Sequence, residues 1–440
     1  MRKTLIATFI TGVCLSLQAQ SADLLQIYQE ALANDQVFAS ARASLNAGQE
    51  KIVQGRALLL PTINLNGNNN RVTQNIEQAS GLTPTNEYRG NSYSVTLSQP
   101  LLRWANWEQY QQGKLQTAAS DAQFAQAQQD LIVRVSQAYF DVLTSQDALA
   151  SIQAQKIAIT EQLASAKRNF EVGTATITDT HEAQARYDLA IAQEFAGIND
   201  LEIKRSALQQ IIGKPAGDLA ALRAGVKLNS PQPADIDTWV SSAEKQNYNV
   251  ASAELSLEIA KREINRNRAV HLPTLDLVAS KAHSTQSAVL TATGALATNT
   301  STIGVQWTIP LFSGFGVDSK VREAIALENK SRADLDNVRR TAAQGARQAF
   351  FGVNNGLAQV KALEAAEVSS QSALESNRLG YQVGVRINID VLNAQQQLFS
   401  TRRDLAKARY DTMMNGLKLK AAAGSLKEED LKIVNGLLAK

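Results

Sequence analysis

The chain has 440 residues, of which 44% are hydrophobic, 19% charged and only 5% aromatic, with a formal net charge of +3. The near-neutral charge excludes the basic footprint of a nucleic-acid-binding protein, and the normal apolar content excludes a disordered chain. The eight prolines leave 101–214 and 311–440 without any. Because an interior proline costs a helix about 3 kcal/mol, these two stretches predict long helices.

The first 22 residues have the pattern of a secretory signal peptide. Two basic residues precede a short apolar run, and small residues follow it, which is the order that such signals require. Cleavage after Ser21 and cleavage after Ala22 both fit. The apolar run is too short for a membrane anchor, and lipid attachment at Cys14 would need a small residue before it, where valine stands. With Cys14 removed, the exported chain is predicted to contain no disulfide.

A β-hairpin is predicted over about 61–102. Ile63 and Leu65 alternate with asparagines, and the residues of 93–97 alternate between apolar side chains and serine or threonine. Such a period of two is typical of a strand. The segment between the strands, about 76–91, is rich in small and polar residues and predicts an exposed loop.

A very long helix is predicted after the hairpin. From Trp104 to Phe170 there is no proline, and Gly113 is the one interior glycine. Such a helix would be about 100 Å long if continuous. Its alanines permit close helix packing, whereas its many Gln, Ser and Asn residues suit a wall wetted on both sides. An isolated coiled-coil rod would need Leu and Ile heptads, which are sparse.

The second half of the chain repeats the first at an offset of about 211 residues. The segment 60–65, LPTINL, recurs at 272–277 as LPTLDL, and the proline-containing segment 229–234 separates the copies. Further matched positions are Pro100 with Pro310, Gln137 with Gln348, Gly173 with Gly384, Asp179 with Asp390, and Gln184 with Gln395. A second hairpin is therefore predicted over about 273–311, with a loop over about 284–300.

This duplication predicts the organisation of the chain. The expected parts are a signal peptide over 1–22, a first repeat over 23–230, a second repeat over 231–428 and a short C-terminal tail over 429–440. Each repeat contains a helix, a hairpin and long helices. The predicted fold class is mainly α with a small β part of four strands.

Four strands with one apolar and one polar face allow two interpretations. One is a half-buried soluble sheet, and the other is a barrel wall with its apolar face toward lipid and its polar face toward a lumen. The remaining helices are too polar to cover a soluble sheet. Tyr93, Trp104, Trp107 and Trp307 fall at or near the expected strand ends, where barrels carry aromatic girdles. Together with the export signal, these features favour an outer-membrane barrel.

Four strands cannot close a barrel alone. An open edge has no water to satisfy its backbone groups within lipid, so several protomers must share one barrel. Eight strands would leave an interior filled by side chains, whereas twelve strands are wide enough for a passage. A pore therefore favours a trimer or a larger assembly.

Several longer motifs are similar to those of a known family. They are HLPTLDL at 271–277, FEVG at 170–173, ITD at 177–179, AQARYD at 183–188, GYQVG at 380–384, NIDVLNAQ at 388–395, DLAKARY at 404–410 and GSLKEEDL at 424–431. On these residues the chain resembles the TolC-like outer-membrane efflux proteins over essentially its whole exported length. The resemblance implies a homotrimer, with a twelve-stranded barrel in outer-membrane lipid continued by a periplasmic α-helical barrel.

The resemblance also implies a function and partners. Such proteins are exit ducts of tripartite multidrug efflux pumps and of type I protein secretion. The expected partners are a periplasmic adaptor protein and an inner-membrane efflux transporter or ABC exporter, whose docking opens the duct. Neither a nucleic acid nor a cofactor is expected.

A periplasmic gate follows from the same resemblance. Matched motif by motif, its residues are Thr178, Asp179, Tyr381 and Arg386, with bonds among the Asp, Tyr and Arg holding the duct shut. The resemblance also implies an aperture ring, which Asp390 matches. Its second acidic position is Asn393 here, and this should weaken cation binding at the tip. Arg378 also departs from the family, which has an acidic residue there.

Catalysis and metal binding receive little support from the sequence. His181, His271 and His283 are the three histidines and lack ligand spacing. No nucleophile motif or phosphate-binding loop is present, so an enzyme is not expected. Two rival functions from other classes remain: a periplasmic coiled-coil adaptor or scaffold, which would lack lipid-facing strands, and a passive outer-membrane porin, which would be open without partners.

Overall fold

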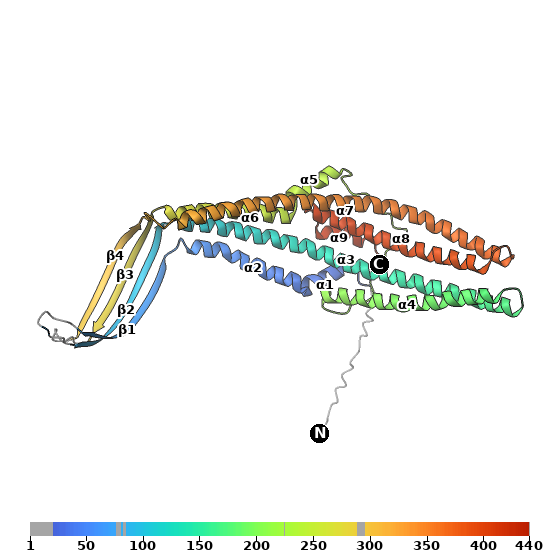
Figure 1. The fold of residues 1–440 in the computed structure, drawn as a ribbon, viewed down its shortest axis with the longest axis horizontal. Coiled ribbons are helices and arrows are strands. Elements are labelled where there is room, and N and C mark those ends of the chain that lie inside the picture. Colours follow the sequence, from blue (N-terminus) through green and yellow to red (C-terminus); the bar gives the residue numbers. More distant parts are fainter. Residues whose placement is uncertain (1–20, 76–80, 82–84, 224, 288–294, 440) are drawn as a thin grey trace, which may run out of the picture. The chain divides into compact units, whose positions relative to one another are not determined.

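The computed structural model describes residues 21–75, 81, 85–223, 225–287 and 295–439. Most of the predicted signal peptide, residues 1–20, lies outside them. In chain order the elements are α1 (Leu24–Asn34), α2 (Gln36–Ala57), β1 (Thr62–Asn75), β2 (Thr85–Leu102), α3 (Trp104–Glu171), α4 (Ile177–Ile212), α5 (Ile236–Gln246), α6 (Tyr248–Arg268), the 3-10 helix η1 (Ala269–His271), β3 (Thr274–Gln286), β4 (Leu296–Thr308), α7 (Gly316–Gln382), α8 (Asn388–Ala422) and α9 (Glu428–Asn435) (Figure 1).

The predicted class, mostly helical with a small β part, is confirmed. Helices α3 and α7 run without interruption for 68 and 67 residues, as the absence of proline predicts. Within the described ranges, none of the helices contains a stretch apolar enough to cross a membrane. The order of helices and strands repeats in the two halves of the chain.

Two compact units are present, and each draws on both halves of the sequence. The sheet unit comprises Ser40–Gln126 and Glu244–Ala342. The turn unit comprises Ala127–Ala243, Ala343 onward, and the chain up to Ala39. The repeat boundaries expected from the sequence remain a prediction, because these units divide the chain in another way.

The sheet unit holds one antiparallel sheet with the strand order β1-β2-β3-β4. The two hairpins are paired in equivalent registers, since Leu65 lies opposite Val95 and its counterpart Leu277 lies opposite Val305. One face, here called the apolar face, carries exposed hydrophobic side chains. They include Ile63, Leu65, Tyr93, Val95, Ile303, Val305 and Trp307.

The opposite face of the sheet is lined by small polar residues. Asn64 and Asn66 of β1 lie opposite Thr96 and Ser94 of β2, and β4 adds Thr302 to this face. The alternation predicted from the sequence therefore divides the sheet into one hydrophobic and one hydrophilic side.

The strands are longer than the sequence predicted. We expected loops over about 76–91 and 284–300, but β2 begins at Thr85 and β4 at Leu296. Polar residues near the loops continue the ladder because strand pairing depends on backbone hydrogen bonds rather than on hydrophobicity. Tyr93 is consequently in the middle of β2 and not near its end, which corrects that prediction.

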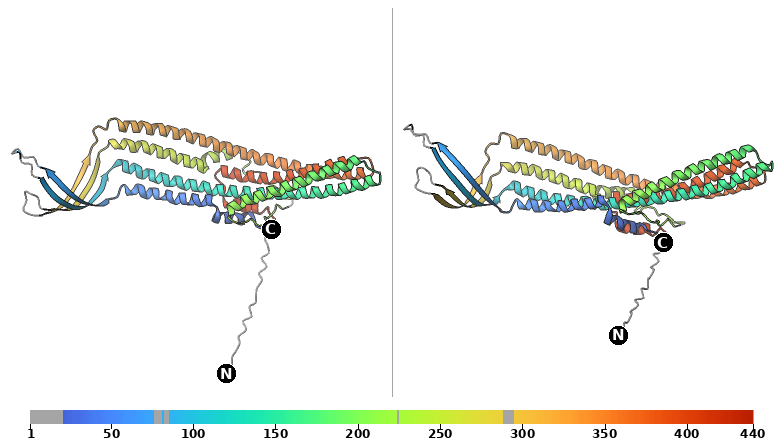
Figure 2. Two further views of the ribbon diagram at one scale, coloured as in Figure 1. Left: turned by 60° about the horizontal axis from the view of Figure 1, so that its bottom comes forward. Right: turned by 90° about the horizontal axis from the view of Figure 1, so that it is seen from below.

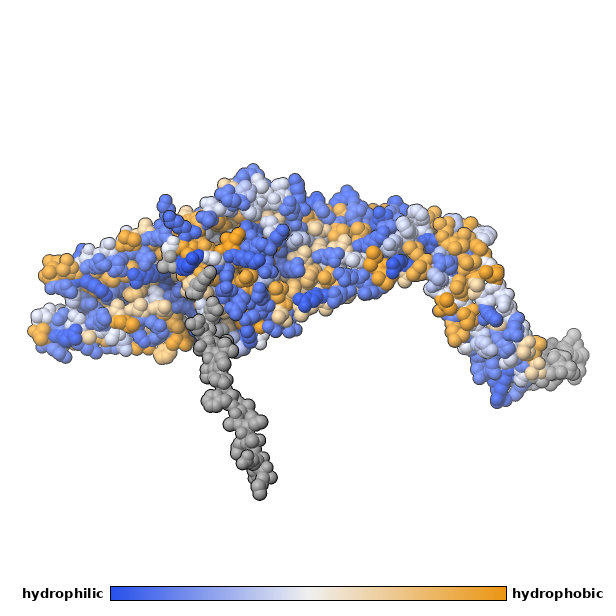
Figure 3. All heavy atoms as spheres, turned by 180° about the vertical axis from the view of Figure 1, so that it is seen from behind, coloured by the Kyte–Doolittle hydropathy of each residue, from blue (hydrophilic) through white to orange (hydrophobic). Residues whose placement is uncertain are grey.

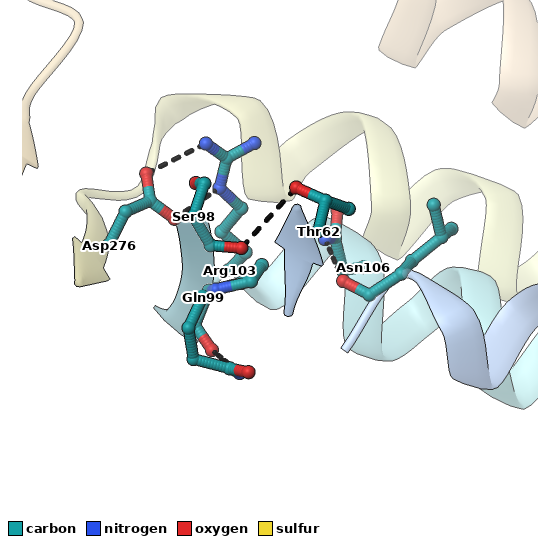
Figure 4. A network of polar contacts seen from close by, with 8 residues as sticks. Thr62, Ser98, Gln99, Arg103, Asn106 and Asp276 are labelled. Atoms are coloured by element: carbon teal, nitrogen blue, oxygen red, sulfur yellow. Dashed lines mark hydrogen bonds and ion pairs between the residues drawn. The ribbon is translucent and has the colours of Figure 1, made fainter. Parts of the chain in front are cut away.

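A polar network fixes the corner where the strands meet the helices (Figure 4). The guanidinium of Arg103, between β2 and α3, donates to both carboxylate oxygens of the buried Asp276 on β3, at 2.8 and 2.7 Å. Asn106 donates to the carbonyl of Leu58 at 2.6 Å, and Gln99 donates to that of Leu59 at 2.9 Å. These bonds hold the first hairpin, its flanking helices and the second hairpin in one arrangement.

Close helix packing in the sheet unit depends on a glycine. A Cβ at Gly113 of α3 would lie 2.6 Å from the carbonyl oxygen of Lys51 on α2. The absence of a side chain therefore permits the two helices to approach each other.

The turn unit has a buried aromatic core. Phe140 on α3 stacks on Tyr410 of α8, with ring centroids 5.7 Å apart. Tyr410 donates to Asp147 at 2.9 Å, and Tyr139 donates to the carbonyl of Ala220 at 2.8 Å. The residues of the expected C-terminal tail also pack here, because they form α9 and bury Leu431 completely.

Candidate functional site

All the predicted gate and aperture residues lie around two turns of the turn unit, α3–α4 and α7–α8, which are at the same end of that unit (Figure 2). In each turn a glycine ends the first helix in the left-handed conformation, with φ of 76° at Gly173 and 79° at Gly384. This conformation is strained for other residues, and it lets the chain reverse within a few residues.

The first turn is closed by a capping box. The hydroxyl of Thr176 accepts a hydrogen bond from the N–H of Asp179 at 3.3 Å, and the Asp179 carboxylate accepts from the N–H and the hydroxyl of Thr176 at 3.0 and 2.9 Å. This arrangement satisfies backbone donors that a helix start leaves unpaired. The carboxylate of Asp179 is thus engaged in holding its own helix.

The second turn is held by a tie to the first. Its N-cap residue, Ile387, makes no side-chain hydrogen bond. The next residue, Asn388, is completely buried and donates to the backbone carbonyl of Asp179 at 3.1 Å. Its amide oxygen accepts a hydrogen bond from Gln162 on α3. Asn388 therefore joins the starts of α8 and α4 to the last turns of α3.

Hydrophobic packing supports this tie. One buried cluster joins α3, α4 and α8, and another joins α7 and α8. The first contains Ile159, Leu163, Ala166, Ala183, Ala190 and Leu392, and the second contains Leu374, Val391 and Leu398.

The gate residues predicted from the resemblance share one cleft but not one set of bonds. Asp179, Tyr381 and Arg386 all line a cleft of about 880 Å³. Within the described chain, the Tyr381 hydroxyl accepts from Asn169 at 3.2 Å, and Arg386 lies 3.7 Å from Asp390. Thr178 is exposed on the first turn of α4.

The aperture residues lie on the first turns of α8. Asp390 and the exposed Asn393 line a second, smaller cleft together with Arg386. Asn393 accepts a hydrogen bond from Arg186 of α4 at 3.0 Å. Arg378 lines the larger cleft with Arg386, so two guanidinium groups face this site.

The sequence motifs did not reveal the roles of two asparagines. Asn388 stands in a quoted motif, yet its tie between the turns depends on burial that no sequence spacing shows. Asn169 contacts Tyr381 across 212 positions. A polar residue at the first position of a helix, after an apolar N-cap, is the one signal that could have drawn attention to Asn388.

The polar groups of the site join the ends of neighbouring helices. Across the described ranges, no group of three or more His, Cys, Asp or Glu residues is placed to hold a metal ion. The polar groups of the site instead join helix ends through single hydrogen bonds, each worth about 0.5–1.5 kcal/mol. Bonds of this strength can be exchanged when helices move.

Comparison with known proteins identifies relatives over nearly the whole chain. The chain is 33% identical over 431 residues to the outer membrane protein TolC of Escherichia coli K12, covering 96% of this chain and 86% of the relative. It is 34% identical over 437 residues to the proteases secretion protein PrtF of Dickeya chrysanthemi, covering 98% and 94%.

A solved structure supports the fold. The outer membrane channel CmeC of Campylobacter jejuni superposes with a TM-score of 0.80 at 17% identity, over 94% of this chain and 90% of that one. The family described as Outer membrane efflux protein matches residues 27–214 and again 239–425. The chain therefore belongs to the outer membrane efflux protein family and is a channel protein of the outer membrane.

Proposed function

We propose that three copies of the chain close one twelve-stranded barrel and form a gated exit duct. The observation that carries this proposal is the pairing of the sheet: among the described strands, β1 and β4 each have a neighbour on one side only. The apolar face suits lipid, and an open strand edge is not tolerated there. Three four-stranded sheets give twelve strands, enough for a passage.

The internal duplication specifies how neighbouring copies would pair. Within the chain, β2 of the first repeat pairs with β3 of the second, and Val95 lies opposite Lys281. The counterparts of these two residues are Val305 on β4 and Asn69 on β1. If β4 of one protomer pairs with β1 of the next in the register that joins β2 and β3, Val305 of one copy lies opposite Asn69 of the next.

Disulfide cross-linking tests this arrangement. The one natural cysteine, Cys14, lies in the predicted signal peptide, so a V305C/N69C variant has no competing thiol once that segment is removed. Paired Cα atoms are about 5 Å apart, within disulfide range, so oxidation should produce covalent trimers. V305C/L65C is the matched control, because it is four residues out of register. Equal cross-linking of both variants, or dimers alone, would contradict the proposal.

The gate at the two turns is the second part of the proposal. Asp179, Tyr381 and Arg386, with the exposed Thr178 beside them, hold the helix ends together until a partner docks. In support, Asp179, Tyr381 and Arg386 line one cleft, and Asn388 joins the two helix starts. Asp390 and Asn393 would line the narrowest passage, with one carboxylate per protomer at this level.

Single-channel conductance tests the gate and separates it from the passive-porin alternative. The duct should show low basal conductance that rises in Asp179→Ala and in Arg386→Ala. Thr176→Ala is the control for Asp179→Ala, because it removes the capping box and keeps the carboxylate. A high basal conductance in the natural chain would support a porin, and unchanged conductance in both variants would refute the gate.

Docking partners are proposed from the turns and the relatives. Both turns expose apolar side chains, and such groups gathered on a surface are typical of a protein interface. They are Val172, Ile177, Val383, Val385 and Ile387. We assign them to a periplasmic adaptor and an inner-membrane transporter or ABC exporter. A strain lacking the chain should lose drug resistance, protein secretion or both, and Val385→Asp should reproduce that loss while the trimer still assembles.

A further inference from the structure

The apolar face of the sheet changes from hydrophobic to basic along the strands. Successive rows from β1 to β4 are Ile63–Leu97–Ala279–Ile303, Leu65–Val95–Lys281–Ser301 and Gly67–Tyr93–His283–Asn299. Closer to the hairpin loops, Arg71 lies opposite Arg89 on the same face. On the side of the sheet seen in Figure 3, hydrophobic side chains gather next to the helices and hydrophilic ones toward the hairpin ends.

Two of these cations lack an acidic partner. Arg71 forms an ion pair with Glu87 at 2.8 Å. Among the described residues, no carboxylate is within ion-pair distance of Arg89 or Lys281, and both side chains are exposed. Glu87 is the one acidic residue that the described strands place on this face. The face therefore carries an excess of positive charge at this level.

The height of the hydrophobic part matches a membrane. On β4, Asn299 lies in the same row as Tyr93 and is eight residues from Trp307. Their separation along the strand is about 27 Å at ~3.4 Å per residue. With a strand tilt of ~40° this is about 20 Å along the membrane normal, close to the ~25 Å apolar band of such barrels. Trp307 and Tyr93 thus mark its two borders, where aromatic rings are favoured.

The cations lie on the outer border. The Tyr93 ring packs against His283, with centroids 4.9 Å apart. Arg89 is four residues beyond Tyr93, about 10 Å above the border along the membrane normal. Lys281 is one row inside, and its long side chain can extend its amine outward while its methylenes stay on apolar surface. Both charges therefore reach the level of lipid headgroups.

We propose that this basic belt, formed by Arg71, Arg89, Lys281 and His283, binds the phosphate groups of an acylated glycolipid in the outer leaflet of the outer membrane. The inference rests on the proposed function, which puts the helices on the periplasmic side and the hairpin ends outside. Arginine binds phosphate through two parallel donors and lysine binds it as a point charge.

A lipid fits this surface better than a dissolved anion. The belt continues without a break into Val95, Ile303 and Val305, which are exposed and apolar. Acyl chains would cover these side chains while the phosphates meet the cations. A free phosphate ion would contact only exposed cations, whose attraction is screened by salt.

The test measures lipid binding by the full chain in phosphatidylcholine nanodiscs. The probes are lipid A with both phosphates and the same lipid without phosphate. The natural chain should bind the phosphorylated form at least about thirtyfold more tightly, since each of the two unpaired cations near a charged lipid surface adds about fivefold. R89Q/K281Q should lose about thirtyfold in affinity for it. Equal affinity for the two lipids, or unchanged binding by R89Q/K281Q, would overturn the proposal.

Further variants separate charge from folding. R89K/K281R keeps both charges and should bind as the natural chain does. R340Q/K361Q removes two exposed cations from α7 and should also leave binding unchanged. At constant ionic strength, inorganic phosphate should not displace the lipid, and displacement would show a site for free anions instead.

The outcomes also distinguish the two proposals. A natural chain that neither inserts nor conducts would refute the proposed function and the lipid belt together. A chain that inserts and conducts, yet shows no preference between the lipids, would refute the lipid belt alone. Because Arg89 and Lys281 belong to the sheet unit and the gate residues belong to the turn unit, R89Q/K281Q should keep the basal conductance of the natural chain.

Discussion

The two turns of the turn unit carry a carboxylate at the same helical position and use it differently. Asp179 and Asp390 each stand at the third residue of a helix. Asp179 is bound by the N-cap Thr176. Asp390 follows an N-cap, Ile387, that offers no hydroxyl, and its neighbour is Arg386 at 3.7 Å. The two repeats therefore hold equivalent carboxylates in different contacts, one with its own N-cap and the other with an arginine.

The polar residue has moved by a single position between the repeats. The first helix starts with Thr176 and Ile177, and the second starts with Ile387 and Asn388. Ile177 is 46% exposed, whereas Asn388 is completely buried. A threonine at the N-cap satisfies its own helix, but an asparagine one residue later points into the core and bonds to another helix. The first turn therefore has a local cap where the second has a tie between turns.

Removing that tie should have the largest effect. Asn388→Ala leaves the carbonyl of Asp179 and the amide of Gln162 without their partner, which costs about 2–3 kcal/mol when such groups are buried. If the tie exists only in the closed duct, each ~1.4 kcal/mol raises the open fraction about tenfold. Conductance records of single channels measure this change.

Asn199→Ala is the matched control for Asn388→Ala. Asn199 is exposed on α4 and lies outside both clefts of the turns. Its replacement should leave conductance and thermal stability within error of the natural chain. If both variants conduct alike, Asn388 does not hold the turns together.

A second pair of equivalent positions differs in charge. Asp35 and Asn247 are 212 positions apart, the same offset that separates Leu60 from Leu272, so they are equivalent positions of the two repeats. Each of them caps the start of a helix. Burial acts to raise the pKa of Asp35, but hydrogen bonds from Arg134 and from the N–H of Phe38 outweigh it, so the pKa lies below its ordinary value. The stability of the α1–α2 junction should therefore depend on the charge of Asp35, whereas the equivalent α5–α6 junction is capped by the uncharged Asn247.

Asp35→Asn should remove this acid sensitivity. A carboxylate with a lowered folded pKa stabilises the protein above its unfolded pKa, near 4, and this contribution is lost as the pH falls through the folded value. The variant should be about 1–2 kcal/mol less stable than the natural chain at about pH 7, and the difference should shrink toward about pH 3. Denaturant titrations of the detergent-solubilised protein measure it, and a difference independent of pH would contradict the assignment.

The sequence predicted the fold more fully than the site. Missing prolines identified α3 and α7, and alternation with period two identified the sheet faces, because both signals are local. Strand length was underestimated, since Glu87 and Arg89 have no apolar pattern and belong to the strand through backbone pairing, which the sequence does not show. The bonds of Asn388 and Asn169 join residues more than 200 positions apart, and only the folded chain brings them together.

Thr176→Ala should have a moderate and local effect. Loss of the capping box costs about 1 kcal/mol and releases the carboxylate of Asp179. Hydrogen exchange in the first turn of α4 should accelerate about fivefold, whereas that of α8 should not change. Thr176→Ser is the control, because it keeps the hydroxyl, and faster exchange in both variants would show that the cap does not depend on it.

Ile387→Thr should have the smallest effect and is the most direct test of the comparison. It gives α8 the N-cap that α4 has, so Asp390 should turn toward the introduced hydroxyl and away from Arg386. The cap contributes at most about 1 kcal/mol, and the exposed pair that it replaces contributes about 0–1 kcal/mol, so the net gain should be a few tenths. A double-mutant cycle between Arg386 and Asp390 measures the coupling directly. The coupling should disappear in the Ile387→Thr background, and an undiminished coupling would show that the N-cap residue does not decide how the duplicated carboxylate is used.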